Sequence, residues 1–423
     1  MPLGWRQAIR WASATALCAL CLAAPAIAGS DLASGDGSAA DNERLLPDIY
    51  PTDPVLANGD WLREPYDPFF DVDWSVALRG TYTKATAGER FDIRLVPNVT
   101  LEHIGSRSAI SLDASTEITR PSEGGNIDIG ALRLGLQTGY DLDSVTRLTA
   151  NGNLVLTQPT PGTPGLASNI AIAPQSLSGG ADVGITRQFG RFNIGLTGAA
   201  QRNIYGPTTL TDATVIDNWD QNYTSLDTGL RIGFEATPIF EVFGTAGLGR
   251  DIFDQAGSNA ADATLRGGIT GRWNGILEAT LSTGVGLRSF DDAGLADVVT
   301  QLYDAQVTFT PDPTWRMTAG FATTVAPPGP DAGGTTRVDY TANAEVAYTV
   351  NSWLALRALA DWNATRFAGS ANTETGYGLG AGADYKVNAH TALTADYGFD
   401  HSDSSTSGTQ EAHRVTVGIT LSR

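Results

Sequence analysis

Apolar and polar residues alternate along most of this chain. Between residues 91 and 95, for example, Phe91, Ile93 and Leu95 are apolar, and the residues between them are charged. The same period of two recurs in about eighteen segments from Trp74 onward, among them 110–118, 132–140, 277–287, 354–362 and 415–421. Because successive side chains of a β-strand point to opposite faces, each segment predicts a strand with one apolar and one polar face.

The length and spacing of these segments favour a membrane barrel. Most run for about 10 to 15 residues, whereas strands of soluble sheets have about 5 or 6 and tilted membrane-crossing strands about 9 to 11. Tight turns such as 188–190 and 273–275 alternate with long links such as 158–175 and 206–220. An open sheet edge is excluded in lipid. We therefore predict an all-β fold: a single closed transmembrane antiparallel up-and-down β-barrel of about 18 strands (16–18), with short periplasmic turns and longer outer loops.

Aromatic residues are sorted by position along the predicted strands. One group lies beside the tight turns, on the apolar face, and a second group lies toward the long links. Two such bands are typical of the interfacial girdles of outer-membrane barrels. The girdle candidates beside the turns are Trp74, Tyr140, Trp273, Trp315, Tyr348 and Tyr385.

Charged residues avoid the apolar face at mid-strand, where an Arg or Lys facing lipid would cost about 2–4 kcal/mol. They occupy the opposite face together with many Gly, Ser, Thr and Ala residues, which predicts a polar interior with room for water. These charges either set a transverse field across a channel or pair as ladders that stiffen the wall. The pore-lining candidates are Arg79, Arg94, Asp113, Glu117, Arg133, Arg147, Asp182, Asp227, Arg231, Glu278, Arg288, Asp304, Arg316, Arg337, Glu345, Arg357, Asp361 and Asp396.

The overall composition excludes several other classes of protein. The chain has 46 acidic and 27 basic residues, a net charge of −19, which argues against a nucleic-acid binder. Its hydrophobic fraction of 42% is too high for a disordered chain. Beyond the N-terminus no apolar run approaches the roughly 20 residues of a membrane-spanning helix.

The N-terminal part has a different character, which divides the chain into three parts. Residues 1–28 read as a signal peptide, with an apolar stretch that ends in the cleavage pattern Ala26-Ile27-Ala28; the alternative is a membrane anchor. Both cysteines, Cys18 and Cys21, lie in this segment, so a mature chain contains no disulfide. Residues 29–73 form an acidic, Pro-rich periplasmic arm, or alternatively a plug or docking strand, and residues 74–423 form the barrel.

The sequence offers little for catalysis. It contains no Gly-x-Ser-x-Gly, Walker or His-Glu-x-x-His motif. His401 and His413 flank the last long link, and a hairpin could bring them together, but solvated loop residues are the simpler interpretation. Pairs such as Asp141 and Asp143 could hold Ca²⁺ only with further oxygen ligands. We therefore predict no enzyme activity, no cofactor and no metal site.

At this point the chain resembles a known group, the "beta-barrel porin 2" type family of alphaproteobacterial outer-membrane proteins. The resemblance rests on Arg63-Glu64-Pro65-Tyr66-Asp67-Pro68, just before the first strand, and on the Gly-rich meander that follows. Two features depart from what the resemblance implies. The stretch Thr83-Lys84-Ala85-Thr86 stands where the family often has a cluster of acidic residues and Asn, and the sequence ends in Leu421-Ser422-Arg423 where many outer-membrane barrels end in Phe or Trp. The resemblance implies an integral outer-membrane protein, active as a general porin or in polysaccharide export, and it supplies no catalytic residues.

Three functions follow from these observations. The first is a porin of the bacterial outer membrane that lets small hydrophilic solutes diffuse passively. The second is an outer-membrane component of an exopolysaccharide export pathway, and the third is a barrel enzyme or anchor with a blocked interior. The expected partners are outer-membrane lipid, lipopolysaccharide and small hydrophilic solutes, and no nucleic acid. A homo-oligomer and periplasmic partners that bind the arm stay open.

Overall fold

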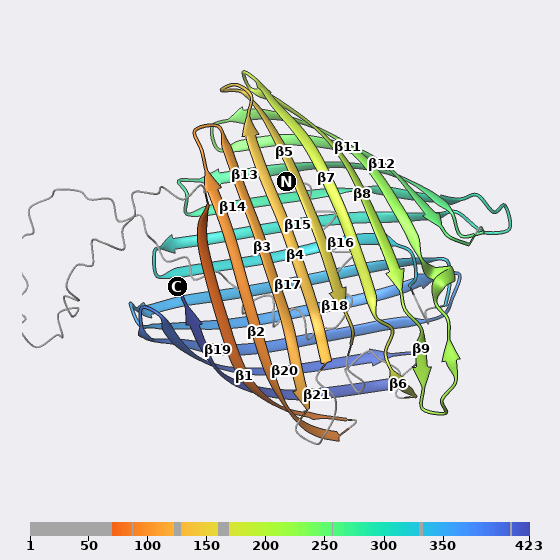
Figure 1. Ribbon diagram of the computed structural model, residues 1–423. Helices are drawn as coiled ribbons and strands as arrows, with labels where there is room; N and C mark the ends of the chain where they lie inside the picture. Colours follow the sequence, from red (N-terminus) through yellow and green to blue (C-terminus); the bar gives the residue numbers. More distant parts are fainter. Residues whose placement is uncertain are drawn as a thin grey trace, which may run out of the picture.

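The computed structural model contains a closed barrel of eighteen antiparallel strands (Figure 1). It describes residues 70–86, 88–121, 128–159, 169–255, 257–329, 333–406 and 408–423. The barrel strands are β1 (Asp71–Ala85), β2 (Gly88–Ile104), β3 (Ser108–Pro121), β4 (Asp128–Asp141), β5 (Thr146–Thr157), β7 (Ser176–Phe189), β8 (Phe192–Tyr205), β11 (Tyr223–Thr237), β12 (Phe240–Phe253), β13 (Ala260–Trp273), β14 (Leu277–Phe290), β15 (Val298–Asp312), β16 (Trp315–Ala326), β17 (Thr336–Asn351), β18 (Leu354–Ala368), β19 (Thr373–Asn388), β20 (Thr391–Ser404) and β21 (Gly408–Ser422).

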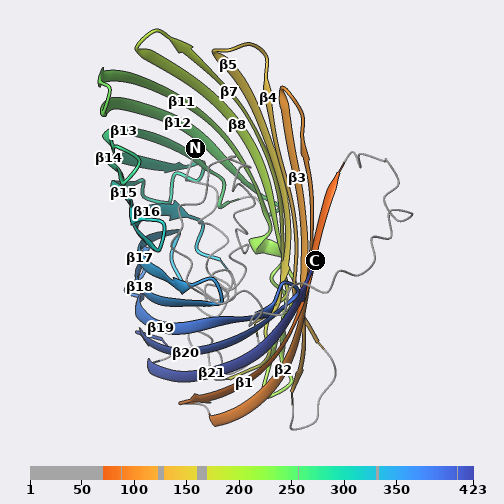
Figure 2. The same cartoon turned by 90° about the vertical axis from the view of Figure 1, so that its left-hand side faces the viewer.

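Each strand pairs with its neighbours in the chain, and the first and last strands close the ring. Arg79 of β1 faces Arg94 of β2 on one side and Gly418 of β21 on the other. Figure 2 shows the wall curving round until β1 and β2 lie beside β21. No barrel strand is left with an unpaired edge, which satisfies the requirement that a sheet in lipid must close. The predicted barrel is confirmed, at the upper end of the expected strand number.

The two ends of the barrel differ. We call the end with the short connections the turn rim and the opposite end the loop rim. The connections at the turn rim are 105–107, 142–145, 190–191, 238–239, 274–276, 313–314, 352–353 and 389–390. At the loop rim a small three-stranded sheet, β6 (Ile170–Ile172), β9 (Thr208–Leu210) and β10 (Val215–Ile216), joins the two longest connections, and η2 (Trp219–Gln221) follows it. The last long link, which was expected between His401 and His413, is wrong. β20 continues through Ser404 and pairs with β21 up to Gly408, so the connection there is short.

The faces of the barrel wall are inverted relative to a soluble protein. Leu265 and Val417 are 66% and 60% exposed, whereas Arg288 is 1% exposed. Arg288 of β14 also reaches Asp251 of β12, across the intervening β13, and side chains two strands apart converge in this way on the concave side of a curved sheet. The polar face is therefore the inner face. Leaving a Leu or Val side chain in water costs about 1.5–3 kcal/mol compared with burying it, so the apolar outer face requires an apolar surrounding such as lipid.

The start of the barrel lies close to the predicted boundary. β1 begins at Asp71 rather than at Trp74. The predicted signal peptide, most of the predicted arm and the segment 63–68 that carries the family resemblance lie outside the described residues. Within the described ranges, no helix has both the length and the apolar character needed to cross a membrane.

Candidate functional site

The charged inner wall is the candidate site. The alternation places every predicted pore-lining residue on the inner face, and cross-strand pairs such as Arg79 with Arg94, Ser115 with Arg133 and Ser282 with Asp304 follow from the register. Many of these charges gather in three groups on different parts of the wall, and each group contains at least one ion pair. Each group is defined by its residues below.

The first group lies on the part of the wall formed by β18–β21 and β1–β3. We call it the Arg357 cluster; its members are Arg79, Arg94, Glu117, Arg357, Asp384 and Asp396. Arg94 Nη1 lies 3.2 Å from Glu117 Oε1, and Arg357 pairs with both Asp384 and Asp396. Five of these six residues, all except Asp384, were predicted to line the pore, and the fold brings them into one place. Asp384 completes the set.

The second group lies in the loop-rim half of β11–β14. We call it the Arg288 cluster; its members are Asp227, Asp251, Asp262 and Arg288. Arg288 Nη1 donates to Asp251 Oδ2 at 2.7 Å and to Asp262 Oδ2 at 2.8 Å. Ser225 donates to Asp251 as well. This part of the wall holds three carboxylates and one guanidinium, so it is acidic.

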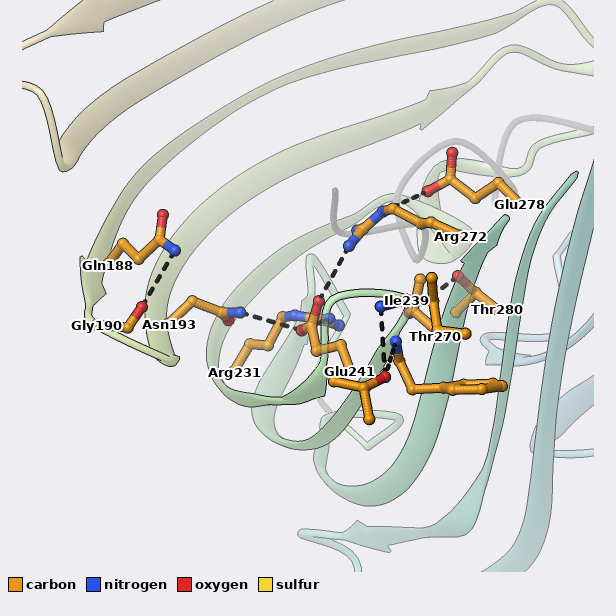
Figure 3. A network of polar contacts seen from close by, with 12 residues as sticks. Gln188, Gly190, Asn193, Arg231, Ile239, Glu241, Thr270, Arg272, Glu278 and Thr280 are labelled. Atoms are coloured by element: carbon orange, nitrogen blue, oxygen red, sulfur yellow. Dashed lines mark hydrogen bonds and ion pairs between the residues drawn. The ribbon is translucent and has the colours of Figure 1, made fainter. Parts of the chain in front are cut away.

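The third group lies near the turn rim on β8 and β11–β14 (Figure 3). We call it the Glu241 cluster; its members are Asn193, Arg231, Glu241, Arg272 and Glu278. Glu241 accepts hydrogen bonds from Arg231 Nη2 at 2.5 Å and from Asn193 Nδ2 at 3.1 Å. Arg272 Nη1 lies 3.7 Å from Glu241, and its Nε donates to Glu278 at 3.2 Å. Opposite charges alternate along this chain of contacts, as in a ladder that joins neighbouring strands.

Other predicted residues stay separate from these clusters. Asp182 accepts a hydrogen bond from Asn151 Nδ2 at 2.8 Å, and Arg337 pairs with Asp339 at 2.9 Å. Arg147 and Asp141 approach only to 3.8 Å. The further predicted positions Asp113, Arg133, Asp304, Arg316, Glu345 and Asp361 lie on the inner face at other heights and strands.

Several charged residues of the clusters were not among the predicted candidates. The missed residues are Glu241, Asp251, Asp262, Arg272 and Asp384. Each stands at an inner position of the same alternation, and Glu241, between Phe240 and Val242, shows the signal plainly. Extending the period of two to the ends of each strand would have found them.

Inner-face glycines let long polar side chains lie flat against the wall. A Cβ at Gly418 would stand 2.8 Å from Cγ of Arg79, and one at Gly378 would stand 2.5 Å from Oδ1 of Asp361. These distances are too short for a real side chain, so each charged group rests over a glycine of the next strand. This arrangement keeps charged side chains along the wall instead of across the interior.

The predicted girdle residues lie near the turn rim, on the outer face. Trp315 stacks on Tyr348 with ring centroids 4.3 Å apart, and Trp353 meets Tyr385 edge-on at 5.3 Å. Trp273 packs edge-on against Phe240. Trp74 and Tyr140 stand exposed on the same face. Pairs of rings at strand ends fit the amphipathic zone where a membrane meets water.

Two outward-facing arginines form ion pairs with aspartates at the loop rim. Arg202 Nη1 donates to Asp254 Oδ1 at 2.8 Å, and Arg250 Nη1 donates to Asp291 Oδ1 at 2.8 Å. In both pairs the second guanidinium nitrogen contacts the second carboxylate oxygen. The hydrogen bond from Arg202 holds the pKa of Asp254 below its usual range, and Arg250 does the same for the pKa of Asp291. These arginines lie near the rim, where a charge on the outer face costs little.

The histidines do not form a common site. His401 Nδ1 lies 3.2 Å from Glu411 Oε1, whereas His413 Nδ1 lies 2.9 Å from the hydroxyl of Tyr397. Within the part of the chain that the structure describes, no group of three or more His, Cys, Asp or Glu residues is arranged to hold a metal ion.

Several solved structures align with most of this chain at low sequence identity. Pseudomonas aeruginosa OccK3 (OpdO) aligns with a TM-score of 0.44 and 14% identity over 83% of this chain and 96% of its own. The outer membrane protein opdK of the same species aligns with a TM-score of 0.43 and 10% identity over 84% and 99%. The FrpB iron transporter of Neisseria meningitidis (F5-1 variant) aligns with a TM-score of 0.42 and 10% identity over 79% of this chain and 63% of its own. At this level of identity the likeness concerns the fold alone.

The family comparison covers most of the sequence. No curated protein matches the chain. The family model described as "Putative beta-barrel porin 2" matches residues 75–423, which confirms the resemblance predicted from the sequence. With the barrel, its apolar outer face and its charged inner wall established, the protein belongs to this family of beta-barrel porins.

Proposed function

We propose that the protein is an outer-membrane porin through which small hydrophilic solutes diffuse passively. The observation that carries the proposal is the inverted sorting of side chains around eighteen closed strands, with charges inside and apolar residues outside. Barrels of 16–18 strands enclose an aqueous channel. The inner glycines support the same function, because they keep large polar groups against the wall.

The orientation and surroundings belong to this proposal. An N-terminal signal peptide exports the chain, the turn rim faces the periplasm, and the loop rim faces outward, as in bacterial barrels with short periplasmic turns. The apolar face contacts outer-membrane lipid and lipopolysaccharide. The polysaccharide-export alternative depends on the arm of residues 29–73, most of which lies outside the described residues.

Reconstitution in a planar bilayer tests the function directly. We expect stepwise, ohmic conductance in KCl from the purified protein, and uptake of small neutral sugars into vesicles that contain it. A natural control is the same preparation unfolded by boiling, which loses the barrel. Repeated insertions of folded barrel with no conductance would refute the proposal and favour a blocked interior.

A further inference from the structure

We propose that Arg79 and Arg94 form a binding site on the inner wall for small oxyanions, namely carboxylates or phosphate. The inference rests on the proposed pore, since it names a class of solute that the pore would hold in passage. Its basis is the local arrangement of charges in the Arg357 cluster.

The two arginines are direct cross-strand partners on the same face of β1 and β2. Like charges in this position destabilise a sheet, so their juxtaposition calls for an explanation beyond folding. Arg94 has Glu117 at 3.2 Å. For Arg79, no carboxylate lies within ion-pair distance among the described residues.

The carboxylates near Arg79 form ion pairs with other arginines. Asp384 and Asp396 both pair with Arg357, and Glu117 pairs with Arg94. The charges that act on Arg79 are those of Asp396, Glu117, Arg357 and Arg94. Two acidic and two basic groups therefore surround a guanidinium that has no ion-pair partner in the part of the chain that the structure describes.

Among the described residues, part of the hydrogen-bonding capacity of the two guanidinium groups is unused. The Nε atoms of Arg79 and Arg94 are buried, and neither has a hydrogen-bond partner in the described part of the protein. A concave recess is lined by both arginines and by Glu117, Arg357, Asp396 and Arg414. Gly418 provides the space in which Arg79 lies. A planar guanidinium offers two parallel N–H donors, which match the two oxygens of a carboxylate or phosphate.

Equilibrium binding to the folded, detergent-solubilised protein tests the site without relying on conductance. Calorimetric titrations use succinate, inorganic phosphate and, as an uncharged control, succinamide. We expect saturable binding of at least one oxyanion and none of succinamide. Arg79→Gln should weaken that binding at least about tenfold. Asp396→Asn should strengthen it, because it removes a negative charge near Arg79 that repels an entering anion. The succinate and phosphate titrations show which oxyanion the site prefers.

Arg316→Gln is the matched control, because it removes one exposed inner arginine from β16, on another part of the wall. It should leave oxyanion binding within about twofold of wild type. If Arg79→Gln yields no heat-modifiable barrel, Arg79→Lys replaces it, with an expected loss of about threefold because the two-pronged donor is gone. Absence of binding to the wild type, or equal losses in the Arg79 and Arg316 variants, would overturn the site. Conductance without oxyanion binding refutes this inference alone, and binding without conductance refutes the pore alone.

Discussion

Replacement of Arg288 by Met should destabilise the barrel strongly. The side chain of Arg288 is 1% exposed, and its Nη1 atom holds Asp251 and Asp262 at 2.7 and 2.8 Å. Methionine retains much of the aliphatic stem but leaves both carboxylates without a cation. Removing one partner of a buried ion pair costs about 3–5 kcal/mol, whereas an exposed pair contributes about 0–1 kcal/mol. Because 23% of the Asp262 side chain is exposed and retains water, we expect a loss of about 3 kcal/mol.

Urea unfolding of the barrel in lipid vesicles, followed by tryptophan fluorescence, measures this loss. Arg316→Met is the matched control, since Arg316 is exposed and forms no ion pair among the described residues. Its stability should stay within about 0.5 kcal/mol of wild type. Adding Asp251→Asn to the Arg288 variant removes one of the isolated charges and should recover at least about 1 kcal/mol.

Two results would refute the reasoning. A loss below about 1 kcal/mol for Arg288→Met would mean that water reaches the carboxylates and screens them as it does at a surface. A further loss on adding Asp251→Asn would mean that Asp251 contributes through contacts other than its charge pair with Arg288.

Two further predictions concern the outer face. Asp254→Asn should lower the urea midpoint of unfolding near neutral pH. Arg202 holds the pKa of Asp254 below its usual range, so the ion pair stabilises the folded barrel at pH values above the ordinary aspartate pKa. That stabilisation is lost as the pH falls through the lowered pKa. Comparing urea midpoints at about pH 7 and about pH 2 checks this, and an equal difference at both would contradict it. Leu281→Arg places a charge on the lipid face of β14 and should lower the free energy of unfolding by about 2–4 kcal/mol in the same assay. Ser282→Arg, the next residue along the strand, faces Asp304 on the inner face and should be tolerated. Similar losses of stability in the two variants would contradict the assignment of the faces.

The face of each residue could be predicted from the sequence because the wall separates two different solvents. Lipid outside and polar groups inside force the period of two, so Arg79 and Leu281 reveal their faces without any knowledge of their neighbours. Strand ends were less predictable. In the segment 400–404 every residue is polar, which reads as a loop, yet the ladder to β21 continues there because a barrel strand can extend beyond the apolar belt.

Which inner residues meet could not be predicted, because alternation specifies a face but not the register between strands. Arg288 meets Asp251 from two strands away, 37 residues apart in the chain. Such contacts depend on the stagger of β12, β13 and β14 and on the curvature of the wall. The sequence likewise does not reveal that Arg79 has no ion-pair partner among the described residues. Two acids, Asp396 and Glu117, and two other arginines act on it, so the numbers of charges alone would allow every arginine to be paired.

The transverse field and the stiffening ladder, both left open by the sequence, correspond to different parts of the wall. In the Glu241 cluster the opposite charges alternate and contact one another, which suits a ladder near the turn rim. In the Arg288 cluster carboxylates exceed cations, and at Arg79 a guanidinium has no carboxylate at ion-pair distance among the described residues. In the proposed pore, these two unequal regions lie on different walls and would orient ions and dipolar solutes. Salt distinguishes the two roles: buried pairs are screened little, whereas a field across water weakens within a Debye length of about 10 Å at 0.1 M. Ion selectivity should therefore fall with salt concentration while barrel stability changes little.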